Sequence, residues 1–210
     1  MLLIKNGKIM TMADTAYENG YVICEGSKIL KVGQNISEAE YLIKDDAVVI
    51  DAAGKYVLPG LIDAHCHIGL WEDAVGIEGE DGNEMSDPVT PHLKAIDGIY
   101  PYDRSFTEAR ENGVTTVVAG PGSSNVIGGQ FAALKTYGKR IEDMILRDSV
   151  AMKVAFGENP KMSYGEKKQS PMTRMATAAI LRENFMKAKQ YKEMLDEYEN
   201  DKENKDKPEY

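Results

Sequence analysis

The stretch Leu58-Pro-Gly-Leu-Ile-Asp-Ala-His-Cys-His-Ile-Gly-Leu-Trp71 decides the fold of this chain. Alternate side chains of a β-strand point to opposite faces. One face of this stretch is polar towards its end and holds Leu61, Asp63, His65 and His67. The other face is apolar throughout and holds Ile62, Ala64, Cys66 and Ile68. This division is typical of a barrel strand, whose outer face packs on helices and whose inner face carries the site at its C-terminal end.

His65 and His67 are the predicted metal ligands. Residues i and i+2 of a strand lie roughly 6.6–6.8 Å apart at Cα, so both imidazoles can reach one zinc ion. On spacing alone, two polar residues near a strand end are an equally good interpretation. The metal pair is favoured because unpaired imidazoles are costly in an apolar strand, and because Asp63 on the same face could orient one ring. Cys66 points the other way and is interpreted as a buried apolar residue.

The phrase Pro59-Gly-Leu-Ile-Asp-Ala-His-Cys-His67, after a β-rich segment, resembles the first barrel strand of the metal-dependent amidohydrolase superfamily. Within that superfamily the chain is most similar to imidazolonepropionase-related amidohydrolases. The resemblance implies hydrolysis of an amide-type C–N bond, in a cyclic or small amide substrate, by metal-activated water. Zinc is the expected ion, with His65 and His67 as ligands.

Two further metal-site candidates rest on the same resemblance. In many amidohydrolases a carboxylated strand lysine bridges two metals, and in others a glutamate after a strand is a ligand. Lys153 and Glu158 occupy such places here. An ion pair between Lys153 and an aspartate or glutamate is an equally good interpretation of that lysine.

Residues 1–57 predict a small β-rich domain. Short apolar runs alternate with turn signals, among them Asn6-Gly7, expected to be a hairpin turn, and Gly26-Ser27. Several strands at this spacing suggest a small β-sandwich. We expect this domain to act as scaffolding.

Residues 58–195 predict the first units of a (β/α)8 TIM-type barrel, so the fold class is α/β. Strands are expected at 61–68, 114–119 and 150–157, and helices at 102–112, at 141–147 and from Ser170-Pro171 onward. The methionine and aromatic stripe of the last helix predicts core packing. The Gly-rich residues 120–130 predict a substrate-facing turn and not a nucleotide loop. Glu84, Asp87 and His92, in the polar excursion 72–97, either shape a pocket or solvate a surface loop.

The composition limits the kinds of molecule that the chain is expected to bind. The net charge of −9 argues against nucleic acid and anionic membranes. The apolar content of 42% is that of a soluble globular protein, and the N-terminus reads as a strand, not a signal peptide, so we expect a cytoplasmic protein. Residues 196–210 predict a charged tail or linker.

Length sets the last expectation. A complete barrel takes about 250 residues, whereas the 210 residues here include the β-rich segment. We therefore expect about half a barrel, inactive alone, with the remaining ligands and the base on a missing C-terminal half or on another chain. The alternative is a non-catalytic half-barrel module that acts by association, because an open sheet edge invites a partner, including a homo-oligomer.

Overall fold

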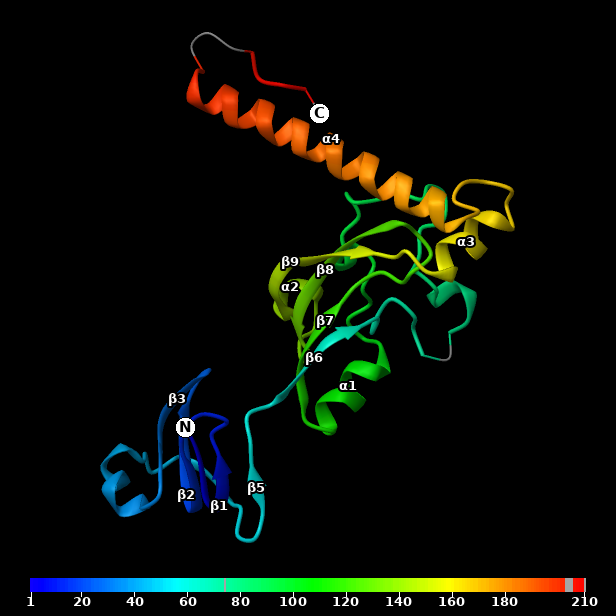
Figure 1. Cartoon of the computed structure of the whole chain (residues 1–210). Coiled ribbons are helices and arrows are strands. Elements are labelled where there is room, and N and C mark those ends of the chain that lie inside the picture. The colour runs from blue at the N-terminus through cyan, green and yellow to red at the C-terminus, as the bar shows by residue number, and fades with distance from the viewer. Residues whose placement is uncertain (74, 203–205, 210) are drawn as a thin grey trace. The chain divides into compact units, whose positions relative to one another are not determined.

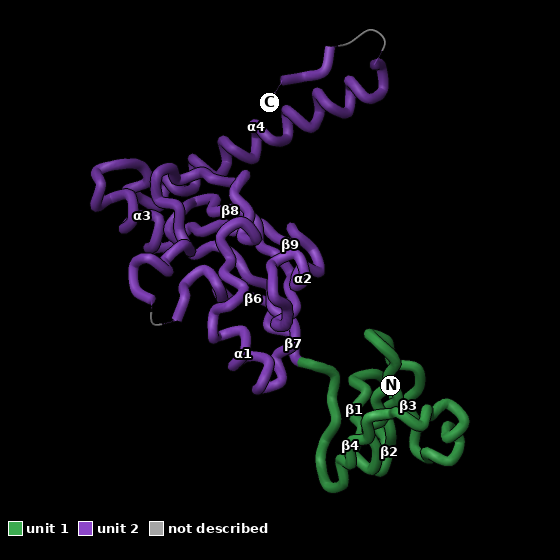
Figure 2. Tube along the Cα trace, turned by 180° about the vertical axis from the view of Figure 1, so that it is seen from behind, with its two compact units in different colours: residues 1–60 green, residues 61–210 purple. Residues whose placement is uncertain are grey.

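The computed structural model describes residues 1–73, 75–202 and 206–209. The chain divides into two compact units, Met1–Gly60 and Leu61–Tyr210 (Figures 1 and 2). From sequence, the division was expected after residue 57. Among the described residues, no helix has both the length and the apolar character needed to cross a bilayer.

The first unit is built on one five-stranded sheet. Its strands are β1 (Leu2–Met10), β2 (Ala16–Glu25), β3 (Lys28–Gly33), β4 (Val48–Asp51) and β5 (Tyr56–Val57). The order is β3-β2-β1-β4, with β5 also beside β1. Two 3-10 helices, Ile36–Glu38 and Glu40–Leu42, contribute to its core. The β-rich prediction is confirmed, but the sandwich is wrong, because the described residues of this unit form a single sheet.

The predicted hairpin turn at Asn6-Gly7 is also wrong. β1 runs through both residues, and its pairing with β2 shifts between Lys5 and Gly7. Asn6 takes φ +62°, the left-handed conformation that Asn tolerates better than most residues. A Cβ at Gly7 would lie 2.9 Å from Cγ2 of Val57. The pair therefore forms a bulge inside a strand, where the sequence pattern alone resembles a turn.

The second unit carries a four-stranded sheet. Its strands, in spatial order, are β6 (Leu61–Cys66), β7 (Val114–Ala119), β8 (Ile127–Lys135) and β9 (Ile145–Val154). β6 and β7 are parallel, and β8 is antiparallel to both β7 and β9. Consequently β6, β7 and β9 run in one direction, with β8 inserted against it.

This topology confirms two predicted strands and corrects the third. The segment expected at 150–157 begins earlier and ends earlier, as β9. The helix expected at 141–147 shrinks to α2 (Ile141–Met144). β8 was missed because Gly128 and Gly129 at its start made the segment look like a loop.

Three longer helices complete the unit. α1 (Arg104–Glu111) confirms the predicted short helix, and Asp103 caps it by accepting from Ser105 N at 3.0 Å. α3 (Glu158–Gly165) follows β9. α4 (Arg174–Asn200) begins after Thr173, which accepts from the backbone N–H of Ala176, and not at Ser170. It also extends into the expected tail 196–210, of which 203–205 and 210 lie outside the described residues.

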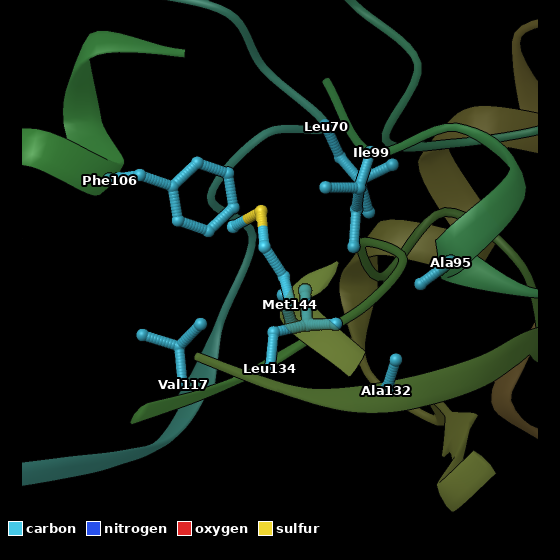
Figure 3. Close-up of a cluster of buried hydrophobic side chains, with 9 residues drawn as sticks. Leu70, Ala95, Ile99, Phe106, Val117, Ala132, Leu134 and Met144 are labelled. Atoms are coloured by element: carbon cyan, nitrogen blue, oxygen red, sulfur yellow. The ribbon is translucent and has the colours of Figure 1, made fainter. Parts of the chain in front are cut away.

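The core of this unit forms where the excursion meets the sheet (Figure 3). Its buried side chains are Leu70, Ala95, Ile99, Phe106, Val117, Ala119, Ala132, Leu134 and Met144. Residues from the excursion, from α1, from β7 and β8, and from α2 thus share one cluster. The excursion is therefore a packed part of the fold, with 3-10 turns at Ile77–Gly79 and Ala95–Asp97.

The predicted core stripe of α4 is wrong. Met175 is 80% exposed and Phe185 is 55% exposed. Part of this face, including Phe185 and Ala188, lines a cavity of about 530 Å³ whose other wall includes Ile127 and Met152. The helix is amphipathic as predicted, but few of the described residues pack against its apolar face.

Candidate functional site

The two histidines of the decisive stretch lie at the C-terminal end of β6. Their ring centroids are 5.0 Å apart, and the ring planes meet at 81°. Nδ1 of His67 lies 2.7 Å from the carbonyl oxygen of Gly120, just after β7. A carbonyl only accepts, so Nδ1 carries a proton, and in the neutral ring Nε2 of His67 keeps its lone pair. This is the arrangement that fixes the tautomer of a metal-binding histidine.

Lys153 approaches the same place from β9. Its Nζ lies 3.5 Å from Nε2 of His65. Partial burial lowers the pKa of the Lys153 amine, because an apolar environment disfavours the charged form. No ion pair between Lys153 and a carboxylate occurs among the described residues. Of the two interpretations of Lys153, the ion pair is therefore not found among the described residues, and the amine lies beside an imidazole.

Two aromatic rings that sequence reasoning missed border the histidines. Phe131 of β8 lies 5.3 Å from His65 and 6.3 Å from His67, measured between ring centroids. Trp71 lies 5.1 Å from His67. Trp71 could have been found, since it follows His67 by four residues and is the sole tryptophan of the chain. Phe131 could not, because its strand was not predicted.

Other predicted residues lie differently. Asp63 accepts from the backbone N–H of His65 at 3.1 Å, which is not the expected contact with an imidazole. Glu158 is an exposed residue that pairs with Lys161 at 3.0 Å at the start of α3. Cys66 packs against the core cluster, and burial raises the pKa of its thiol. This fits the interpretation of Cys66 as a buried apolar residue.

The polar residues of the excursion have structural contacts. The Glu84 carboxylate accepts from Ser86 N at 3.0 Å, and that of Asp87 accepts from Val89 N at 2.7 Å. Their carboxylates therefore order their own loop. His92 is exposed.

A buried hydrogen-bond chain ties this loop to the Gly-rich loop and to α3. The Tyr164 hydroxyl donates to Oδ1 of Asn125 at 2.6 Å. The Asn125 amide donates in turn to the Glu84 carbonyl at 2.6 Å and to Oγ1 of Thr90 at 2.8 Å. Burial raises the pKa of Tyr164 to about 12. The loops around the histidines are thus fixed by buried polar contacts.

The donors present fit part of a metal site. Two imidazoles at the end of β6 and one amine from β9 lie close together, and an imidazole pair suits zinc. No cluster of three or more histidine, cysteine, aspartate or glutamate side chains able to hold a metal occurs among the described residues. A catalytic zinc usually has three protein ligands. The described residues therefore offer three candidate ligands, two imidazoles and one amine.

Comparison with known proteins gives a consistent result. The chain is 32% identical over 191 residues to the amidohydrolase tasK of Hapsidospora irregularis, a match that spans 85% of this chain and 19% of that protein. A solved amidohydrolase of Thermotoga maritima superposes over 100% of the chain, at 40% identity and a TM-score of 0.88, and 53% of that structure is covered. The imidazolonepropionase of Alkaliphilus metalliredigens is 41% identical over 51 residues, which are 24% of this chain and 12% of that enzyme. No family model matches.

Proposed function

Because the chain belongs to the amidohydrolase superfamily, we propose that it supplies the first metal ligands, His65 and His67, of an enzyme that hydrolyses amide-type C–N bonds. The substrate class is a cyclic amide or a small amide. The metal is a divalent ion, with zinc expected from the imidazole donors.

The observation that carries this proposal is the proximity of two imidazoles and one amine. His65 and His67 come from β6 and Lys153 from β9, two strands that run in the same direction in the sheet. Active-site residues of α/β barrels come from the C-terminal ends of several strands. His65 is exposed, and His67 and Lys153 are partly buried, so all three groups remain accessible to a ligand beside the buried Phe131 ring.

Each side chain has a distinct part in the proposed site. A bound divalent metal polarises a carbonyl and lowers the pKa of water. His67 keeps Nε2 free because Gly120 holds its Nδ1 proton. Lys153, with its lowered pKa, reaches the neutral amine form more readily. That is the form that adds carbon dioxide to become a carbamate, with release of a proton.

The remaining parts of the site are proposed to lie outside this sequence. The chain spans about half of the Thermotoga maritima structure and about a fifth of tasK. We take β6, β7 and β9 as the first three strands of a barrel and β8 as an antiparallel insertion. Further strands would supply the missing ligand, the base and a wall against solvent.

A metal-binding experiment tests the proposal. Equilibrium dialysis with zinc should show about one ion per wild-type chain at saturation. His65→Ala and His67→Ala should each weaken binding by at least the ~10–100-fold typical of a lost outer-shell partner. The matched control is His92→Ala, which removes an exposed histidine. Equal zinc affinity in all four proteins would contradict the proposal.

Association without catalysis is the second candidate, and the exposure of α4 favours it. A helix face whose Phe185 is 55% exposed and lines a cavity beside the sheet is suited to a partner surface. In this reading the chain binds another polypeptide and contributes no ligand. Zinc binding that depends on His65 and His67 distinguishes the two candidates.

A further inference from the structure

Phe131 has a place in the site that neither the comparisons nor the sequence motif assign. Its side chain is 3% exposed, so the ring is part of the interior. Besides its two imidazole neighbours, it has the Nζ of Lys153 at 5.9 Å from its centroid. One ring thus borders His65, His67 and Lys153, although it comes from the inserted strand β8 and not from β6 or β9.

Gly120 explains how the ring reaches this position. A Cβ at Gly120 would lie 2.3 Å from Cγ of Phe131, so any side chain there would collide with the ring. The Gly120 carbonyl accepts from His67, and its N–H donates to the Cys66 carbonyl at 3.2 Å. The ring of Phe131 therefore rests on the same peptide that holds the tautomer of His67.

The strand register places the ring beside Lys153 as well. Phe131 is opposite Ala151, and Gly129 is opposite Lys153. Phe131 and Lys153 are therefore diagonal neighbours on one face of the sheet. A Cβ at Gly128 would lie 3.2 Å from Cγ of Lys153, so the small residues of β8 leave space for the lysine stem.

We infer that Phe131, resting on Gly120, is a positioning residue that fixes the orientation of the His65 and His67 imidazoles in the site. The inference rests on the proposed function for its metal. A shorter aliphatic side chain would leave the imidazoles freer to rotate, so His67 would keep its bond to Gly120 only part of the time. We expect a loss in metal affinity of about 10–100-fold, as for other groups that orient ligands.

Two measurements test this on the whole 210-residue chain, with Phe131→Leu as the variant and Phe106→Leu as the matched control. Phe106 is 2% exposed and belongs to the same unit. First, nitrogen NMR of the histidine rings in metal-free protein at pH 8 reports the tautomers. Wild type and Phe106→Leu should show His67 protonated at Nδ1, and Phe131→Leu should show a mixture. Second, zinc affinity by chelator competition should fall only in Phe131→Leu.

The outcomes separate this inference from the proposed function. If wild type binds no zinc, the proposed function fails and the ring NMR alone decides the role of Phe131. If wild type binds zinc, an unchanged His67 tautomer or an unchanged zinc affinity in Phe131→Leu overturns the inference. Equal losses in Phe106→Leu also overturn it, because they would show a general effect of core loosening. Gly120→Ala, if folded by circular dichroism, should reproduce the Phe131→Leu result.

Discussion

Single buried hydroxyl groups hold the loops of this unit, and Tyr164 gives the clearest prediction. Tyr164→Phe removes the donor to Asn125 and leaves the Asn125 oxygen buried without that partner. We expect a loss of about 1–3 kcal/mol in the free energy of unfolding, measured by urea titration at pH 7. Tyr137→Phe is the control, because Tyr137 is 73% exposed, and it should stay within about 0.5 kcal/mol. Equal stabilities for both variants would contradict the prediction.

The same residue predicts a pH dependence. The folded-state pKa of Tyr164 is raised from 10.0 to about 12, because burial disfavours the phenolate. A raised pKa gives a stabilising contribution that is fully present below pH 10 and is lost as the pH rises through about 12. The stability difference between wild type and Tyr164→Phe should therefore narrow over this interval. A difference that stays constant between pH 9 and the alkaline limit of folding would oppose this assignment.

At the scale of single residues, the sequence predicts which side chains share a face of one strand better than it predicts contacts between strands. The shared face of His65 and His67 follows from the two-residue period. The contact of Lys153 with His65 joins residues 88 positions apart, and only the relative placement of β6 and β9 creates it. The role of Phe131 could not be predicted because its strand, β8, was not predicted. The Gly120 carbonyl could not be singled out either, because every residue has a backbone carbonyl.

At the scale of elements, β8 shows why glycine is ambiguous in sequence. Gly129 takes φ +125°, and a Cβ there would lie 2.8 Å from the Leu93 carbonyl oxygen. The glycine is needed for a close approach between the strand and the excursion, not for a turn. The same cause explains Asn6-Gly7 in β1. Strands and helices with unbroken apolar periods, such as β7 and α1, were predictable.

Gly129→Ala tests that explanation. The Cβ meets backbone and the conformation is strained for any L-residue, so we expect a loss of about 1–3 kcal/mol in unfolding free energy. Gly165→Ala is the matched control. Nothing lies within 4 Å of its Cβ position, and it ends α3, so alanine should be neutral or stabilising by up to about 1 kcal/mol. Urea titration gives the unfolding free energy of both variants. Equal changes in that free energy would refute the role given to Gly129.

At the scale of the whole molecule, the number of catalytic groups that the chain supplies determines whether it can hydrolyse a substrate alone. It offers two imidazoles and one amine, whereas hydrolysis needs a full ligand set, a base beside the attacking water and a cavity that excludes solvent. The amphipathic face of α4 was predictable from its period, but its exposure was not, because burial depends on what packs against the helix. The proposed remaining strands would cover the exposed face of α4 and would also supply the missing metal ligands.

We therefore predict that the 210-residue chain, assayed alone with zinc, hydrolyses no cyclic or small amide above background. Zinc bound by so few donors and open to water gains little electrostatic effect. Addition of a polypeptide that supplies the further strands should restore turnover, and His65→Ala in this chain should abolish it. A Phe185→Gln variant should weaken the reconstitution, since Phe185 is exposed on α4, whereas Tyr41→Gln in the first unit, 78% exposed, should not. Turnover by the chain alone that disappears in His65→Ala would show that the parts counted here already suffice.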